Sequence, residues 1–435
     1  MQVALVSLGC DKNTIDSEIM LGLLKNAGLQ LTADPGQADV IVVNTCCFIE
    51  DAQQESINAI LEMAQYKEQG KCRALVVTGC LAQRFSAELS AELPEVDGFL
   101  GTGQVSKIVE VVEKALGDSR VSLIGEPGLV EGPRVVSTPG HYAYLKIAEG
   151  CDHRCSFCVI PAVRGGYVSR PLERVVAEAQ ELVQRGVKEL ILVAQDTSRY
   201  GVDLVGKPLL ATLLHRLNDL AGLRWIRVLY TYPALINDEL LEALLLPKVC
   251  RYLDLPLQHV SARVLRSMNR PVMDYRRLLG RIRQRVPGIH LRTTMIVGYP
   301  TEEDEDFQEL LAFVRSMRIE NLGVFKFSPQ AGTKAAELPP LPPAVVEERY
   351  ARIMETQQGI VAQLNEELIG TVLPVMIDGP SPESSLVYQG RHQGQAPEID
   401  GLVYLGMEFA PGTMVQVKIT DARAYDLTGE VLGFA

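Results

Sequence analysis

Short runs of Val, Ile and Leu that alternate with helical patterns constrain the fold of this chain most. In residues 1–120 such runs occupy 3–8, 40–44 and 74–78, and the spacing predicts helices near 16–27, 50–68 and 83–92. Strands this apolar are typical of parallel sheets that helices cover on both faces. The repetition therefore predicts an α/β domain built on a doubly wound parallel sheet.

The alternation continues beyond a Gly- and Pro-rich stretch at 121–140. Six apolar runs with intervening helical patterns predict a partial (β/α)6 barrel. Its expected strands are 143–148, 189–194, 224–230, 252–255, 290–297 and 322–327. A helix is expected at 344–369, and short runs at 372–377, 401–404 and 414–419 predict a small β-barrel. We therefore expect a domain at 1–120, a linker at 121–140, a barrel domain at 141–370 and a small β-barrel at 371–435.

Composition and charge narrow the class of protein. The chain has 435 residues, 47% of them hydrophobic, which excludes a disordered or fibrous chain. It has no apolar run long enough to span a membrane, and its nine cysteines come without a secretory signal, so we expect a cytoplasmic protein. The net charge of −12 divides into −9 over 1–135, +2 over 136–370 and −5 over 371–435. Acidic ends disfavour nucleic acid and favour a basic protein partner.

Three cysteines form the strongest local signal. Cys151, Cys155 and Cys158 make a C-x3-C-x2-C motif directly after a predicted strand. Three thiolates this close suit an iron–sulfur cluster whose fourth iron stays open to a small molecule. A structural zinc site is the weaker reading, because it needs four closed ligands.

This motif, with Phe157 before its last cysteine, resembles that of the radical S-adenosylmethionine (SAM) enzymes. The resemblance implies that SAM chelates the open iron of a 4Fe-4S cluster and is cleaved to a 5′-deoxyadenosyl radical. It also implies the partial (β/α)6 barrel that the strand count predicts separately.

A second set of cysteines follows the first three predicted strands. Cys10, Cys46 and Cys80 each come just after one of these strands. Because parallel strands end at one edge of their sheet, we expect the three thiols to meet there and to hold a second iron–sulfur cluster. Neighbouring residues on extended chain point in opposite directions, so we expect Cys46 and not Cys47 to be the ligand.

The whole chain resembles the methylthiotransferases, which join a three-cysteine domain, a radical SAM barrel and a C-terminal TRAM β-barrel. The motifs that carry this resemblance are Leu8-Gly-Cys-Asp-Lys-Asn13, Asn44-Thr-Cys46, Thr78-Gly-Cys80 and the 150–161 segment. The resemblance implies two 4Fe-4S clusters, SAM as radical source and methyl donor, and an electron donor such as flavodoxin or ferredoxin.

Two branches of this family compete. One modifies an adenosine of tRNA, and the other adds a methylthio group to the β-carbon of an aspartate in ribosomal protein uS12. The segments 193–197, 200–203, 253–259 and 266–270 resemble the second branch. The acidic C-terminal domain favours it separately, because tRNA binding needs Lys and Arg. We therefore expect uS12 as the substrate, with the tRNA enzyme as the alternative.

Six further residues are candidates for contacts with SAM or the substrate. We expect Phe157 and Ile160 to flank the adenine, Gln195 and Asp196 to lie near the ribose, and Gln258 and Arg292 to end two further barrel strands. The nine arginines of residues 263–292 leave two readings open, a solvated helical face or a contact with RNA.

Overall fold

The computed structural model describes residues 1–117 and 120–435, which form two compact units. The N-terminal unit comprises Met1–Ser137, Ala148–Ser169 and Ser328–Ala336. The barrel unit comprises Thr138–Ile147, Arg170–Phe327 and Glu337–Ala435. Each unit is described by itself below. This division differs from the expected one, which followed chain order, because two loop segments of the expected barrel domain pack with the N-terminal sheet.

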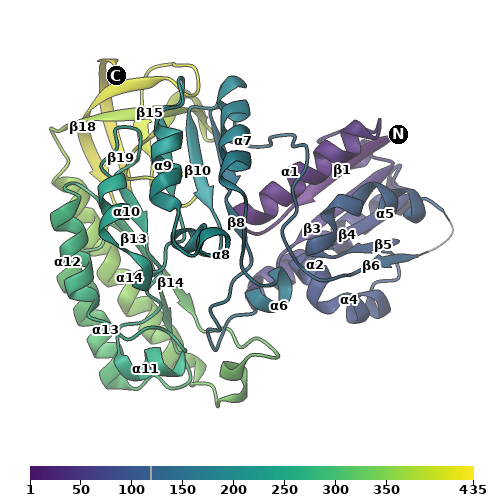
Figure 1. Ribbon diagram of the computed structural model, residues 1–435, viewed down its shortest axis with the longest axis horizontal. Coiled ribbons are helices and arrows are strands. Elements are labelled where there is room, and N and C mark those ends of the chain that lie inside the picture. Colours follow the sequence, from purple (N-terminus) through teal and green to yellow (C-terminus); the bar gives the residue numbers. More distant parts are fainter. Residues whose placement is uncertain (118–119) are drawn as a thin grey trace. The chain divides into compact units, whose positions relative to one another are not determined.

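The N-terminal unit is built on a six-stranded parallel sheet of order β2-β1-β3-β4-β5-β6. Its strands are β1 (Gln2–Ser7), β2 (Gln30–Leu31), β3 (Val40–Thr45), β4 (Ala74–Gly79), β5 (Gly98–Leu100) and β6 (Val121–Leu123). Its helices are α1 (Asp11–Asn26), η1 (Pro35–Gln37), α2 (Glu50–Ala64), α3 (Tyr66–Gln69), α4 (Cys80–Glu92), η2 (Thr102–Lys107) and α5 (Ile108–Ala115). The doubly wound parallel sheet is confirmed, with α1 and α5 on one face and α2 and α4 on the other (Figure 1).

Every residue of β3 and β4 is buried, which agrees with the apolar runs that predicted these strands. The short strand β6 pairs with β5 inside the expected linker, so the chain leaves the sheet later than predicted. The segment 148–169 adds a two-stranded pair, β8 (Ala148–Glu149) and β9 (Val168–Ser169), and the helix α6 (Ile160–Arg164).

The barrel unit holds six central strands in two parallel sheets, β11-β10-β7 and β12-β13-β14. They are β7 (Tyr142–Lys146), β10 (Glu189–Val193), β11 (Trp225–Val228), β12 (Tyr252–Asp254), β13 (His290–Val297) and β14 (Asn321–Lys326). The helices are α7 (Leu172–Gln184), η3 (Thr197–Arg199), α8 (Val202–Val205), α9 (Leu210–Asn218), η4 (Pro233–Leu235), α10 (Asp238–Ala243), α11 (Ala262–Ser267), α12 (Tyr275–Arg285), α13 (Asp304–Met317) and α14 (Pro343–Glu366). Of the 3-10 turn η5 (Lys334–Glu337), all residues but the last belong to the N-terminal unit. All six predicted strands are present.

The C-terminal segment forms a closed barrel of order β15-β16-β17-β19-β18, drawn in yellow in Figure 1. Its strands are β15 (Val372–Ser381), β16 (Ser384–His392), β17 (Val403–Leu405), β18 (Met414–Arg423) and β19 (Asp426–Phe434). The small β-barrel is confirmed, although the sequence did not indicate β16 and β19. Among the described residues, no helix has the length and apolar character that a membrane span requires.

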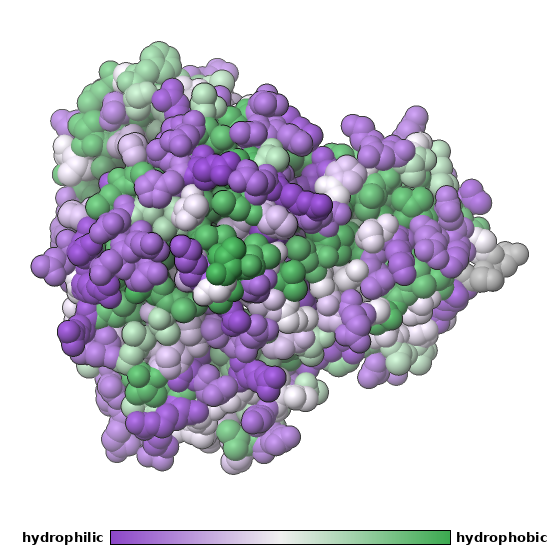
Figure 2. Space-filling view, viewed as in Figure 1, coloured by the Kyte–Doolittle hydropathy of each residue, from purple (hydrophilic) through white to green (hydrophobic). Residues whose placement is uncertain are grey.

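The arginine-rich stretch 263–292 includes α12, which hydrophilic side chains cover in Figure 2. Its arginines pair with acids of neighbouring elements: Arg281 with Asp238 at 2.8 Å, and Arg283 with Glu320 at 3.1 Å. These pairs favour the solvated helical face over a contact with RNA.

Candidate functional site

The structure places Cys10, Cys46 and Cys80 at the carboxyl edge of three adjacent strands. Cys10 caps α1 after β1, Cys46 directly follows β3, and Cys80 is the first residue of α4 after β4. Register pairs Ser7 with Asn44 and Thr45 with Gly79, so the three chain segments leave the sheet side by side. The amino ends of α1 and α4 therefore lie at this edge of the sheet, and each helix begins at one of these cysteines.

Two glycines make this close approach possible. Gly9 has a φ of +87°, and a Cβ there would lie 2.8 Å from the Cβ of Cys46. Gly79 has a φ of +93°, and a Cβ there would lie 2.4 Å from the Asn44 side chain. Any other residue would push the cysteine-bearing turns apart, which explains the Gly-Cys pairs of the sequence.

Asn13 and Arg164 connect the three turns. The Asn13 amide donates to the carbonyls of Leu8 at 2.9 Å and Thr45 at 3.0 Å, and its Oδ1 accepts from the Cys80 thiol at 3.8 Å. The same Oδ1 accepts a hydrogen bond from the buried Arg164 guanidinium. Asn13 belongs to the first cysteine motif, whereas no sequence signal singled out Arg164.

The guanidinium of Arg164 supplies a buried positive charge beside the thiols. It pairs with Asp16 at 2.5 Å and Glu149 at 3.3 Å. Burial alone would lower the pKa of Arg164, but the charges of Cys80, Asp16 and Glu149 raise it well above its usual value. Burial raises the pKa of the Cys80 thiol to about 12, and Arg164 opposes that rise. The arrangement thus holds a permanent cation where thiolates need one.

Cys47 lies on the other side of the chain from Cys46. Its thiol donates to the Cys80 carbonyl at 3.3 Å and is fully buried in the core beneath α2 and α4. Burial raises the pKa of the Cys47 thiol to about 11. The Cys46 sulfur faces Gly9, since a Cβ at that glycine would lie 3.1 Å from it. These contacts favour Cys46 as the ligand.

Three thiols gathered around a cation are the donor type of an iron–sulfur cluster, so the residues present fit that group. Within residues 1–117 and 120–435, no three His, Cys, Asp or Glu side chains close around a single metal ion. The fit to a cluster rests on the donor type, the shared edge and the two glycines.

The second cysteine set lies on the loop between β8 and α6. Cys151 is buried and its N–H donates to the Gly165 carbonyl at 3.1 Å, while Cys155 and Cys158 are half-buried. The Cys158 N–H donates to the Cys155 carbonyl at 3.1 Å, which forms a tight turn. Three thiols on one short, partly exposed loop again fit an iron–sulfur cluster.

The two neighbours predicted to flank the adenine lie on the same loop. Phe157 is half-buried. Ile160 begins α6 and packs against the apolar core beneath α2 and α4. A packing role accounts for Ile160, and a contact with SAM stays a prediction for both residues.

A segment that sequence reasoning missed, Ser328–Ala336, links the two cysteine-bearing regions of the N-terminal unit. The Gln330 side chain accepts from Arg84 of α4 at 2.6 Å and from Gln53 of α2 at 2.9 Å. The Ala335 N–H donates to the carbonyl of Ser156, inside the cysteine loop, at 2.9 Å. No local pattern marks a glutamine in a loop, so no sequence signal pointed to it.

In the barrel unit, Gln195 and Asp196 follow β10 as predicted. Gln195 is half-buried, and the buried Asp196 accepts from the Ser198 hydroxyl at 2.5 Å and the Arg199 N–H at 3.2 Å. Asp196 therefore caps the η3 turn, and its contact with a ribose stays a prediction.

Gln258 lies beyond the end of β12 with a φ of +74°, and Tyr230 lies beyond β11 with a φ of +58°. Gln258 pairs with β13 through its N–H to Thr294 at 2.8 Å. Non-glycine residues in the left-handed region are often held so at functional sites. Tyr230 lies with Gln258 at the carboxyl ends of the barrel strands. Only its backbone angles single it out as a candidate site residue.

The prediction that Arg292 ends a barrel strand is wrong. It is the third residue of the eight-residue strand β13, in the amino half, and not at the carboxyl end where barrel sites form. Its guanidinium pairs with Asp400 at 2.5 Å, and Asp400 also accepts from the Tyr252 hydroxyl at 2.7 Å. Arg292 therefore helps to fasten the C-terminal barrel to the central strands.

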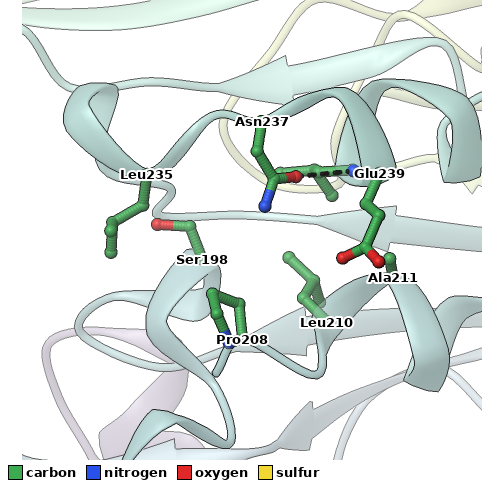
Figure 3. A pocket seen from close by; sticks show the side chains of 8 residues that line it. Ser198, Pro208, Leu210, Ala211, Leu235, Asn237 and Glu239 are labelled. Carbon is green, nitrogen blue, oxygen red and sulfur yellow. Dashed lines mark hydrogen bonds between the residues drawn. The ribbon is translucent and has the colours of Figure 1, made fainter. Parts of the chain in front are cut away.

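A small pocket between η3, α9 and α10 is not a ligand site. Figure 3 shows Ser198, Leu210 and Asn237 around it, with the Asn237 side chain accepting the Leu240 N–H at 2.9 Å. Its free volume of about 10 Å³ suits one water molecule at most.

Family models match three parts of the chain. They are the Uncharacterized protein family UPF0004 at residues 2–101, the Radical SAM superfamily at 145–314 and the TRAM domain at 369–432. The first match covers β1 to β5 with the first cysteine set, the second covers the cysteine loop and the barrel strands β10 to β13, and the third covers most of the closed C-terminal barrel.

Solved structures share the fold. A radical SAM methyltransferase, TsrM from Kitasatospora setae, superposes with a TM-score of 0.55 at 13% identity over 87% of this chain and 79% of that one. A second TsrM structure, with cobalamin and a [4Fe-4S] cluster bound, gives 0.56 at 13% identity over 84% and 89%. At this identity the likeness establishes the fold alone.

Curated relatives match along the whole chain. The ribosomal protein uS12 methylthiotransferase RimO of Pelotomaculum thermopropionicum is 51% identical over 99% of both chains. The protein of that name from Symbiobacterium thermophilum is 49% identical over 99% of this chain and 91% of its own length. Identity of this extent across all three matched regions leaves one assignment. This chain belongs to the RimO family of radical SAM methylthiotransferases.

Proposed function

We propose that this protein adds a methylthio group to the β-carbon of an aspartate in ribosomal protein uS12. One observation carries the proposal: three thiols from separate strands gather beside Arg164 in a chain that also has a C-x3-C-x2-C loop. One cluster suffices to cleave SAM, so a second set of thiols calls for a further task, such as handling sulfur. Membership of a family whose relatives are named uS12 methylthiotransferases supports this task and this substrate.

Two cysteine sets are proposed to hold two 4Fe-4S clusters. Cys151, Cys155 and Cys158 hold the one that binds SAM, and Cys10, Cys46 and Cys80 hold the other. When bound, these groups supply a 5′-deoxyadenosyl radical, which can break an unactivated C–H bond, and a carrier for the sulfur. The chain's own residues keep water from the buried Cys46 and Cys80 and keep the Arg164 cation beside them.

The proposed partners follow from the reaction and the charge. A reductant such as flavodoxin or ferredoxin supplies electrons in the cytoplasm, and uS12 binds as substrate. The C-terminal barrel carries a net −5 over residues 371–435, which favours a basic protein over tRNA.

Anaerobic reconstitution with iron, sulfide, SAM and dithionite tests the proposal, with uS12 and unmodified tRNA as parallel substrates. We expect a mass gain of about 46 Da on one uS12 aspartate, the mass of sulfur plus a methylene group. Methylthio-adenosine on tRNA alone would replace the proposal by its alternative.

Cysteine variants separate the two proposed clusters in the same assay. Cys155→Ala should abolish both 5′-deoxyadenosine and product, whereas Cys80→Ala should keep 5′-deoxyadenosine and lose product. Cys250→Ala is the matched control, since Cys250 is a buried thiol of the barrel unit outside both sets. Full product from Cys80→Ala would overturn the role of the second set.

A further inference from the structure

An open groove of about 570 Å³ runs between β1 and α2, within the N-terminal unit. Val6 and Leu8 of the β1 segment and Ala59 and Met63 of α2 form its apolar floor. On this face α2 and α4 pack over β3, β4 and β5, which leaves the side chains of Val6 and Leu8 half-exposed.

The rim of the groove is acidic. Asp51, Glu55 and Glu62 line it and are exposed, and their spacing along α2 places them on one stripe of the helix. The helix contains four acids in all and no Lys or Arg. No ion pair within residues 1–117 and 120–435 engages these three carboxylates. They are therefore available to an external cation.

One end of the groove lies at the edge that carries the first cysteine set. Leu8 precedes Cys10 by two residues, and Asp51 lies in the first turn of α2, soon after Cys46. From Asp51 to Glu62 the helix rises about 16 Å, which matches about five residues of extended chain. A segment bound there would bring the adjoining part of its own chain to the cysteine-bearing edge.

We propose that this groove binds a Lys- and Arg-rich extended segment of the protein substrate. Such side chains lay their aliphatic stems on an apolar floor and place their charged ends on acids at the rim. The charge complementarity selects a basic polypeptide, and the same acids repel a phosphate backbone. This inference rests on the proposed function and assigns the substrate its docking surface.

The test measures steady-state kinetics of the reconstituted enzyme with uS12. The triple variant Asp51→Lys, Glu55→Lys, Glu62→Lys should raise KM for uS12 by about tenfold or more at low salt, with kcat changed far less. The neutral triple Asp51→Asn, Glu55→Gln, Glu62→Gln should raise it by a smaller factor, and it keeps the test valid if the reversal misfolds.

The matched control carries the same charge change elsewhere in the unit: Glu92→Lys, Glu95→Lys, Glu113→Lys, all exposed and outside the groove. If the control triple raised KM as much as the Lys triple of the groove, the effect would be one of net charge, and the groove would be overturned as the docking surface. An unchanged KM in both the Lys and the neutral triple of the groove would overturn it too. Wild type that leaves uS12 unmodified would overturn the proposed function instead, which separates the two failures. Tighter binding of tRNA by wild type than by the groove triple would also overturn the inference.

Discussion

Arg164 in the N-terminal unit and Arg391 in the barrel unit are both buried guanidinium groups held by two carboxylates. Arg164 pairs with Asp16 and Glu149 at 2.5 and 3.3 Å. Arg391 pairs with Asp378 and Glu189, each at 2.8 Å. In both places a buried cation is tolerated because carboxylates replace its lost hydration.

The two networks differ in what surrounds the cation. Arg164 lies beside Cys80 and Cys10, so its charge acts on thiols. Arg391, on β16, shares Glu189 of β10 with Arg227 of β11, whose Nε donates to that carboxylate at 2.7 Å. The second network therefore fastens the C-terminal barrel to the central strands. The same desolvation physics serves a proposed cofactor site in one unit and the joining of two barrels in the other.

Removing Arg164 should have the largest effect, since it should both destabilise the fold and weaken the site formed by Cys10, Cys46 and Cys80. Arg164→Ala leaves Asp16 and Glu149 buried without their cation, which should lower the free energy of unfolding by about 3–5 kcal/mol. It should also lower the iron bound by the Cys10 set. Urea unfolding and iron content per folded protein measure the two effects, with Arg352→Ala, at a partly exposed arginine of α14, as control. Full iron content in Arg164→Ala would refute the claim that the Arg164 network, unlike the Arg391 network, supports a cofactor site.

Arg391→Met should lower the free energy of unfolding by a similar amount, about 3–5 kcal/mol, because Glu189 and Asp378 lose a shared partner. Iron content and 5′-deoxyadenosine formation per folded molecule should stay at the wild-type level. Burial opposes ionisation of Glu189, yet Arg391 and Arg227 hold its pKa below the usual value. A variant that loses iron would mean that this network, too, supports a cofactor site.

Two histidines next to the second network should make the barrel unit sensitive to acid. Burial lowers the pKa of His290 and lowers that of His392 further, and the two rings lie 5.1 Å apart. Because the unfolded histidines bind protons more readily, the free energy of unfolding should fall as pH drops below about 6.5, by up to about 2 kcal/mol per histidine at pH 5.

The double variant His290→Gln, His392→Gln should flatten that dependence in urea unfolding at pH 5, 6 and 7.5. His215→Gln, on the exposed face of α9, should leave it unchanged. A slope that persists in the double variant would assign the acid sensitivity to other groups.

The smallest effect is expected from Cys47→Ala, a substitution close to the Arg164 network. Loss of a fully buried sulfur should cost about 1 kcal/mol, with iron content and product unchanged. Cys46→Ala should instead lower iron content. Equal iron loss in both variants would show that the two thiols substitute for one another.

The sequence predicted the cysteine loop and the three strands before Cys10, Cys46 and Cys80, because both signals are local. A C-x3-C-x2-C spacing is read along the chain, and apolar runs locate strand ends to within a few residues. It did not predict β5 or β6, which are three residues each. Pairing with a neighbouring strand, β4 for β5 and β5 for β6, supplies the stability that such short runs lack alone.

Arg164, Gln330 and the true position of Arg292 needed the tertiary structure. Each acts through partners remote in sequence: Arg164 through Asp16, Gln330 through Arg84, and Arg292 through Asp400. A pattern of residue types along the chain predicts a set of ligand thiols and a fold class, since ligand chemistry and strand periodicity depend on residues that are close in sequence. Which charge lies beside those thiols, and which groove opens next to them, depends on how distant segments pack.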